Sequence, residues 1–204
     1  MSSNDVSTTL LCLHGMACTG RVWDPLIACW PGPVLAPDLA GHGTGPRLET
    51  YGIDAYGEEI RERLAAELSA ADRLVVVGHS MGGAVGAALI PMIDADFAEG
   101  CLALLAVGIK TSWSEEETAG STRVADKGVR WFDQAEEAEN WFLKVSGLYG
   151  LVETGSDIAA SGVVGEAGRF RLRADPEAFR AGPPPPLARQ LAAIGRPFRL
   201  GRGS

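Results

Sequence analysis

The hydrophobic positions of this chain form short unbroken runs, separated by longer segments in which apolar residues recur every three to four positions. Runs of this length that are rich in Val, Leu and Ile are typical of buried strands. A briefer apolar run at residues 33–36 predicts a further short strand. The three longer runs are at residues 8–13, 74–77 and 101–107.

One segment has a clear helical period. Residues 54–69 are expected to form an amphipathic helix, with charged side chains opposite the apolar stripe. Strands and helices therefore alternate along the first half of the chain, which predicts a parallel sheet with crossover helices. The stripe consists of Tyr56, Ile60, Leu64 and Leu68.

After Lys110 the pattern changes to a polar stretch followed by aromatic residues in a helical context. Because ligands bind at the carboxyl ends of parallel strands, residues 111–186 are interpreted as a helical lid, with Trp113, Trp131 and Trp141 as candidates for the substrate pocket. The alternative is a helix that only packs on the flank of the sheet.

The expected division of the chain is residues 1–110 as core, 111–186 as lid and 187–204 as a return to the core. In this last part residues 187–194 predict a helix and residues 197–201 a strand. The proline run at 183–186 predicts a stiff spacer, and residues 201–204 a loop.

A serine between two glycines follows the apolar run at 74–77. The sequence Gly78-His79-Ser80-Met81-Gly82 joins this strand to a helix of small residues, which is the pattern of a nucleophile elbow. The serine must adopt strained backbone there, and a Cβ at either glycine would clash. A phosphate-binding turn or a plain tight connection are the alternatives, although no nucleotide-binding glycine motif is present.

Two loops after strands carry histidines. The first strand ends in His14-Gly15-Met16, where the glycine permits close backbone approach to a substrate. His14 either holds this loop by hydrogen bonds or takes part in proton transfer. Asp38 and His42 lie in a tight glycine-containing loop and are expected to be structural, with a catalytic role as the alternative.

Composition limits the classes of function. At 204 residues, with 46% hydrophobic and 22% charged residues, the chain fits one ordinary globular domain with or without a small excursion. A net charge of −8 argues against nucleic acids and anionic membranes as partners. Neither a secretory signal nor a membrane span is indicated. The four cysteines have no Cys-x-x-Cys spacing, so we expect neither a metal nor another cofactor. A reducing, cytoplasmic location is expected, and Cys12 and Cys101 are expected to be buried.

Taken together, these motifs resemble the α/β-hydrolase fold, a mostly parallel sheet with crossover helices and, here, a helical lid insertion. The resemblance implies Ser80 as nucleophile and the backbone N–H groups of Met16 and Met81 as oxyanion donors. It further implies hydrolysis of a small carboxylic ester, lactone or thioester, with His14, Gly15 and His79 also near the substrate. The motifs that carry it are His14-Gly15, the loop at 37–43, the elbow at 78–83 and Arg196-Pro197.

The chain departs from the family pattern after the nucleophile. The family order is serine, acid, histidine, but all three histidines here precede Ser80, and the strand at 101–107 ends without a carboxylate. Loss of the base costs about 10⁶ in turnover, so this chain alone is expected to be a poor enzyme. We expect the acid and the histidine beyond residue 204, together with the last strand and helix of the sheet.

Two alternatives to this expectation remain. In the first, the chain is complete and is a hydrolase-fold protein that binds a ligand or a partner without turnover. In the second, His79 or His42 serves as an uncommon base, or a second chain completes the site. The sequence makes no prediction of oligomeric state. An unprotected edge strand at 197–201 predicts that this chain is less stable and more prone to associate than an extended one.

Overall fold

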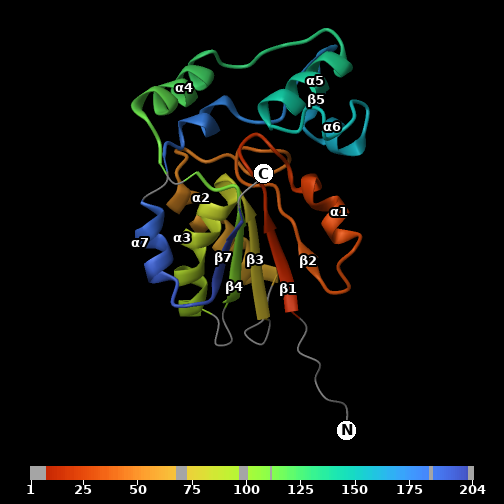
Figure 1. Ribbon diagram of the computed structural model, residues 1–204. Coiled ribbons are helices and arrows are strands. Elements are labelled where there is room, and N and C mark those ends of the chain that lie inside the picture. Colours follow the sequence, from red (N-terminus) through yellow and green to blue (C-terminus); the bar gives the residue numbers. More distant parts are fainter. Residues whose placement is uncertain (1–7, 68–72, 97–100, 111, 184–185, 202–204) are drawn as a thin grey trace.

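The centre of the molecule is a parallel five-stranded sheet. The computed structural model describes residues 8–67, 73–96, 101–110, 112–183 and 186–201. The strands lie in the order β2-β1-β3-β4-β7, and each neighbouring pair is parallel (Figure 1). The predicted parallel sheet is therefore confirmed. The strands are β1 (Thr8–Leu13), β2 (Val34–Leu35), β3 (Arg73–His79), β4 (Cys101–Val107) and β7 (Phe198–Gly201).

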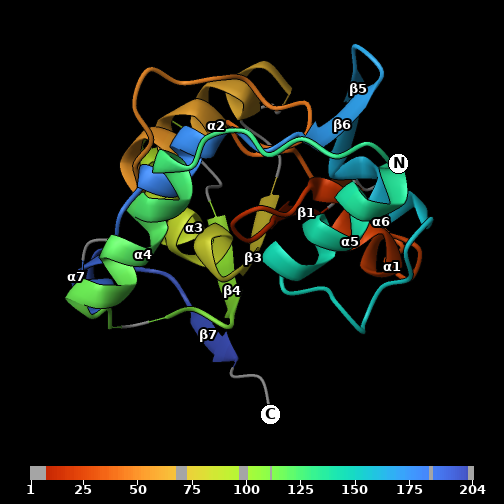
Figure 2. The same ribbon diagram turned by 90° about the horizontal axis from the view of Figure 1, so that it is seen from above.

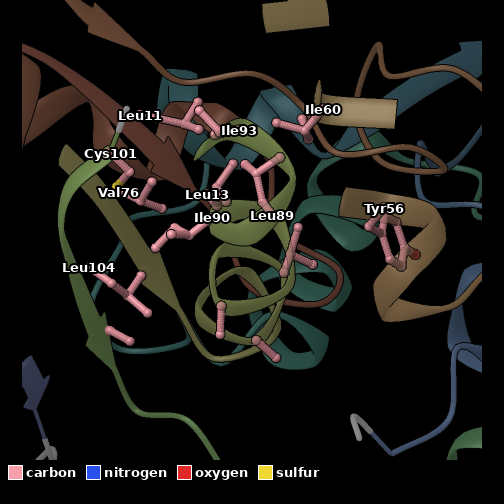
Figure 3. Packing of buried hydrophobic residues seen from close by; sticks show 14 of the residues in the cluster. Leu11, Leu13, Tyr56, Ile60, Val76, Leu89, Ile90, Ile93, Cys101 and Leu104 are labelled. Carbon is pink, nitrogen blue, oxygen red and sulfur yellow. The ribbon is translucent and has the colours of Figure 1, made fainter. Parts of the chain in front are cut away.

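Three helices cover one face of this sheet: α2 (Ile53–Glu67), α3 (Met81–Asp96) and α7 (Leu187–Ala193). Alternate residues of the strands point to this face because side chains of a strand alternate in direction. Figure 3 shows Leu11 beside Ile93 of α3, and Val76 and Leu104 on the side of Ile90, and all five are at most 1% exposed. Burial of Cys12 and Cys101 is also confirmed.

The observed helices agree with most of the predicted ranges. Helix α2 ends at Glu67, so Leu68 and Ser69 of the predicted helix lie outside the described residues. The same is true of residues 1–7, of 184–185 in the predicted spacer and of 202–204 in the predicted loop. The return helix and the strand after it are found where the sequence predicts them.

On the opposite face of the sheet, a short segment that follows β1 covers one side. This segment consists of η1 (Gly20–Trp23) and α1 (Asp24–Ile27). Trp23 and Leu26 pack there against a small cluster that contains Leu10, Cys12 and Val77. The covered side is the half of the sheet that contains β2 and β1, away from β7 (Figure 1).

The segment between β4 and α7 forms a separate layer above the carboxyl ends of the strands (Figures 1 and 2). We call it the cap. It has its own apolar cluster around Phe142, Leu143 and Val163, distinct from the core under the sheet. Its elements are α4 (Glu115–Asp126), α5 (Ala135–Val145), α6 (Asp157–Ser161), β5 (Val163–Glu166), β6 (Arg169–Leu172) and η2 (Pro176–Arg180).

The insertion is predicted to be helical and contains helices, but it also contains two strands, because β5 and β6 pair as an antiparallel hairpin. Ala167 and Gly168, between the strands, have φ of 51° and 79°. Positive φ at both central residues is the requirement of a type I′ turn, which matches the twist of paired strands. Trp131 and Phe132 are also not helical: Phe132 pairs with Phe170 and so extends the hairpin.

Strand β7 forms an edge of the sheet in the described part of the chain and pairs with β4 alone. Phe198 and Leu200 are 37% and 49% exposed, and Leu105 and Val107 of β4 are 41% and 36% exposed. By register, Leu105 lies opposite Arg199, so the two exposed pairs are on opposite faces of the sheet. Apolar side chains and unpaired backbone groups at one edge favour association.

We therefore expect the 204-residue chain to associate reversibly through this edge. In light scattering over a concentration series, the average mass should rise for the unmodified chain and rise less for Leu200→Lys. Leu151→Lys is the matched control, since Leu151 is 81% exposed on the cap, far along the chain from β7. A monomer at all concentrations, or an equal effect of both substitutions, would contradict this expectation.

Candidate active site

The backbone of Ser80 is strained. Its φ is +50°, in the left-handed region that a residue with a side chain rarely adopts, at a cost of order 1–3 kcal/mol. The conformation is held from two sides. The N–H of Ser80 donates to the carbonyl of Val107 at 2.8 Å, and its own carbonyl accepts from Gly83 N–H at 3.0 Å in the first turn of α3. The end of β4 and the start of α3 thus fix the serine.

The glycines on either side of Ser80 are required by close packing. A Cβ at Gly78 would lie 2.5 Å from the Cα of Gly83, and a Cβ at Gly82 would lie 2.1 Å from the carbonyl oxygen of Leu13. Real Cβ contacts are never this short with backbone atoms. The turn between β3 and α3 therefore has room only for glycine at these two positions, as the sequence predicts.

The loop after β1 lies directly against this turn. A Cβ placed on Gly15 would be 2.8 Å from Nδ1 of His79 and 3.4 Å from Cβ of Ser80. The carbonyl of Gly15 accepts hydrogen bonds from Cys18 N–H at 3.1 Å and from Nδ1–H of His14 at 2.8 Å. In a trans peptide the next N–H points opposite to this carbonyl. The N–H of Met16 is thereby directed away from His14.

His14 holds this loop in place. Its Nδ1 donates to the carbonyl of Gly15, and its Nε2 accepts from the N–H of Leu39 at 2.9 Å, which defines the neutral tautomer. The side chain is fully buried, and burial strongly lowers its pKa, with the neighbouring His42 acting in the same direction. His14 thus holds this loop and is not among the residues that line the cavity at Ser80.

Asp38 and His42 also have structural partners. One carboxylate oxygen of Asp38 accepts from Gly20 N–H at 2.7 Å, and the other accepts from Thr44 N–H at 2.8 Å. Burial alone would raise the pKa of Asp38, but these hydrogen bonds outweigh it and hold the pKa below its usual range. His42 is 1% exposed, donates from Nδ1 to the carbonyl of Ala40 at 2.9 Å and packs edge-on against His14.

The buried histidines give stability a definite pH dependence. Burial is the main cause that lowers the pKa of both His14 and His42, so folding favours their neutral forms. Their contribution is fully present above the unfolded pKa of about 6.5 and is lost as pH falls. Between pH 6.5 and 5, His14 alone should cost about 2 kcal/mol, and His42 adds to this loss.

Urea unfolding at both pH values tests this expectation. In His14→Gln, whose side chain does not titrate, the unfolding free energy should be lower at neutral pH and should fall less steeply with acidification. An equally steep fall in the variant would contradict the assignment to His14.

A small cavity of about 90 Å³ opens beside Ser80. Core and cap both contribute to it. From the cap, Trp113 lies between β4 and α4, Ser121 lies in α4, and Phe179 lies in η2. Most of the lining side chains are apolar, which suits a small uncharged group. The lining residues are Met16, Ile53, Ser80, Met81, Ala84, Ile109, Lys110, Trp113, Ser121, Phe179, Ala181 and Gly182.

Of the three tryptophans predicted for the pocket, only Trp113 lines this cavity. Trp131 lies within the cap beneath the guanidinium groups of Arg169 and Arg171, with 5.8 and 5.9 Å from their Cζ atoms to the ring centre. Trp141 is stacked under Arg130 at 4.4 Å. Both rings stack on arginines of the cap and do not line this cavity, and the sequence pattern did not distinguish these two positions from that of Trp113.

Sequence reasoning missed several lining residues. Ile109 and Lys110 follow β4 directly, and the carboxyl end of a parallel strand is a position where ligand contacts are expected. This signal was available. Phe179, Ala181 and Gly182 come from the chain after the hairpin, and no sequence pattern marks them. The ammonium group of Lys110 pairs with Glu117 and lies 5.1 Å from the ring centre of Trp113.

No histidine or carboxylate is hydrogen-bonded to the hydroxyl of Ser80 among the described residues. His79 adjoins Ser80 in sequence, but its ring lies between Gly15 and Gly108 and does not line the cavity. Burial lowers its pKa. A larger cavity, of about 470 Å³, lies elsewhere, between β2, α1 and α2. Because Ser80 does not reach it, we assign the candidate site to the smaller cavity.

Within the described residues, no helix is long and apolar enough to cross a bilayer. No group of three or more histidine, cysteine or acidic side chains is arranged there as a metal site.

Comparison with known proteins places this site in a family. A family model described as the alpha/beta hydrolase family matches residues 10–202, nearly the whole chain. The chain belongs to this family. As an alpha/beta hydrolase it has the expected fold, with a mostly parallel sheet and helices between the strands.

Among curated relatives of this hydrolase is the lipase LipV of Mycobacterium tuberculosis, which is 40% identical over 77 residues. These residues are 37% of this chain and 29% of the lipase, so the match spans less than a third of that relative's length.

Solved structures show the same fold over almost all of the chain. The esterase Rv0045c of Mycobacterium tuberculosis is similar with a TM-score of 0.78 and 24% identity, covering 97% of this chain and 68% of the esterase. An alpha/beta hydrolase of Novosphingobium aromaticivorans is similar with a TM-score of 0.70 and 21% identity, over 98% of this chain and 73% of the other. Identities this low support the fold and leave the reaction to be argued from the site.

Proposed function

We propose that this alpha/beta hydrolase cleaves a small carboxylic ester, lactone or thioester through an acyl-enzyme at Ser80. The observation that carries the proposal is the backbone of Ser80, held at a φ of +50° between two glycines that nothing larger can replace. Strain of this kind persists where the surrounding structure enforces it, and it concentrates at functional sites. Family membership and the esterase and lipase among similar proteins support the same reaction.

In the first step, the hydroxyl oxygen of Ser80 attacks the carbonyl carbon, and its proton passes to a base. The carbonyl oxygen becomes negatively charged in the tetrahedral intermediate. The bond to the leaving oxygen or sulfur then breaks, and the leaving group takes up the proton. Water, activated by the same base, attacks the acyl-enzyme in the second step and releases the acid.

The oxyanion of this intermediate needs two preorganised donors. We assign them to the backbone N–H groups of Met16 and Met81. Both residues line the cavity with Ser80. Met81 is the first residue of α3, where an N–H has no carbonyl partner within its helix. The Met16 N–H is directed away from His14 because the Gly15 carbonyl is held by two donors. Donors of this kind are each worth about 10²–10³ in turnover.

The base and the acid are proposed to come from sequence beyond residue 204. In the described residues His14 and His42 are buried with structural hydrogen bonds, and His79 does not line the cavity. The cap is proposed to act as a lid, since Trp113 and Phe179 close the cavity over Ser80. The small size and apolar lining of the cavity favour a short acyl group. A cytoplasmic location stays a prediction from the sequence.

The test uses the protein as its host produces it. Its intact mass is measured first, for comparison with the 21.4 kDa of this chain. The protein is then treated with a fluorophosphonate and digested, and the adduct is located by mass spectrometry. We expect a mass above 21.4 kDa and a single adduct on the peptide that contains Ser80. A folded protein without an adduct on Ser80 would overturn the proposal.

A second candidate function is binding without turnover. It is favoured by the absence of a base at the Ser80 hydroxyl in the described residues. In that case a host-produced mass near 21.4 kDa is expected, and small apolar esters should raise the melting temperature of the protein while remaining intact in solution. Release of the acid from such an ester would exclude this alternative.

A further inference from the structure

The cap hairpin has one apolar and one cationic face. In β6 and the residue after it, Arg169, Arg171 and Arg173 alternate with Phe170 and Leu172. Because strand side chains alternate in direction, the three arginines share a face. Phe170 and Leu172 pack into the apolar cluster of the cap. The arginines therefore have no packing role in that cluster.

Two of these arginines are positioned by an aromatic ring. The guanidinium groups of Arg169 and Arg171 both lie within 6 Å of the centre of Trp131, at 5.8 and 5.9 Å. Such stacking restrains an arginine while leaving its N–H donors available. The cationic face is thus an ordered feature of the cap in a protein whose net charge is −8.

A cavity of about 200 Å³ lies where this face meets a loop of the core. Three of its eight lining residues are arginines from two distant parts of the chain. Three more are glycines of the core loop. The hairpin that forms one wall stands at the margin of the molecule in Figure 2. The lining residues are Gly41, Gly43, Gly45, Arg47, Val164, Arg171, Arg173 and Asp175.

The positive charge in this cavity exceeds the negative charge. Asp175 is the only carboxylate in its lining, and it is already engaged. Its side chain is 10% exposed, accepts from the hydroxyl of Tyr51 at 3.0 Å and pairs with Arg47 at 3.3 Å. Arg171 pairs with Glu166 at 2.8 Å. Arg173 is half-buried in the wall, and its guanidinium group has no hydrogen-bond or ion-pair partner within the described residues.

The same two segments flank this cavity and the one at Ser80. The core segment that supplies Gly41 to Arg47 continues to Ile53, and the cap segment that supplies Arg173 and Asp175 continues to Phe179 and Ala181. Between them in the cap lies η2, whose five residues span about 10 Å at the rise of a 3₁₀-helix. A ligand that occupies both cavities must therefore span about the length of this helix.

We propose that Arg47, Arg171 and Arg173 form a subsite for a carboxylate or phosphate group on the substrate. This inference rests on the proposed ester hydrolysis at Ser80 and adds the class of substrate, an anionic ester or thioester. The acyl group lies at Ser80, and the anionic group lies about one short helix away. Arginine suits this role because its planar fork of donors matches both carboxylate and phosphate oxygens.

The first experiment measures binding of inorganic phosphate and, separately, of succinate by calorimetry at constant ionic strength. It uses the host-produced protein carrying Ser80→Ala, so that turnover plays no part. Loss of a charge-assisted hydrogen bond should weaken binding about tenfold in Arg173→Gln. Arg169→Gln is the matched control, because Arg169 shares the strand and face but does not line the cavity. Tighter binding of one anion identifies which group the subsite takes.

Absence of binding of both anions, or equal weakening by Arg173→Gln and Arg169→Gln, would overturn the subsite. The second experiment follows hydrolysis of p-nitrophenyl hemiesters of dicarboxylic acids from succinate to sebacate, against matched neutral esters. We expect KM to favour the longer hemiesters, and this preference to be lost in Arg173→Gln and retained in Arg169→Gln. Equal KM values for charged and neutral esters would overturn the substrate class. Failure to hydrolyse any ester would instead refute the reaction at Ser80. The anion-binding experiment would then still test the subsite independently.

Discussion

Ser80→Ala should lower the turnover of ester substrates about a million-fold in the host-produced protein. Removing the nucleophile of a serine triad eliminates the acyl-enzyme, so only binding and oxyanion stabilisation remain. These residual effects keep about 10³–10⁴ over the uncatalysed reaction. Substrate affinity should change little, because Ser80 contributes one side chain among twelve lining residues. The measurement is kcat and KM for a p-nitrophenyl ester, with the fluorophosphonate adduct as a second readout.

Ser121→Ala is the matched control for this variant. Both serines line the same cavity, but Ser121 lies in α4, where its hydroxyl donates to the carbonyl of Glu117. It should therefore retain turnover and labelling. If Ser80→Ala retained turnover, or if both variants lost it equally, Ser80 would not be the nucleophile.

Gly82→Ala should destabilise the fold severely, to the point that little folded protein is recovered. The added Cβ would lie 2.1 Å from the carbonyl oxygen of Leu13 and 2.6 Å from that of His14. Either α3 or the end of β1 must move, and both are packed in the core. Overpacking of well-ordered interiors costs about 1–3 kcal/mol or more, a large share of the 5–15 kcal/mol of a typical domain. Urea unfolding, or the soluble yield, measures this loss.

Gly120→Ala should instead stabilise the fold. Gly120 lies within α4, and the nearest atom to an added Cβ is the guanidinium of Arg123 at 3.8 Å. Alanine is favoured over glycine in a helix by about 1 kcal/mol, so the melting temperature should rise. A mild effect of Gly82→Ala, similar in size to that of Gly120→Ala, would contradict the tight packing described for the elbow.

The core of this protein was predictable because its physical requirements act locally in sequence. Buried strands need unbroken apolar runs, and the elbow needs glycines where Gly78 and Gly82 pack against backbone. The structural roles of His14 and Asp38 were also anticipated, since both sit in tight loops beside strands. Their partners, Leu39 and Gly20, could not be named from sequence because hydrogen bonds across loops depend on the assembled fold.

The cap was less predictable. Its hairpin turn requires positive φ at Ala167, and alanine is not a residue type that predicts this conformation. The hairpin is extended by pairing of Phe170 with Phe132, which is distant in sequence. Two signals were present but not used. Ser114 and Glu117 form a capping box that marks the start of α4, and the alternation of arginines with Phe170 and Leu172 marks β6. The tryptophans gave no comparable signal, because an aromatic ring suits a cap interior and a ligand pocket equally.

The cap and the sheet have separate apolar interiors, one around Phe142 and the other around Leu89 and Ile90. The two interiors are joined near the loop of Gly15, where the thiol of Cys18 donates to the carbonyl of Ser146. We therefore expect substitutions within the cap interior to alter the proposed choice of substrate more than the proposed reaction at Ser80, provided that this link is kept.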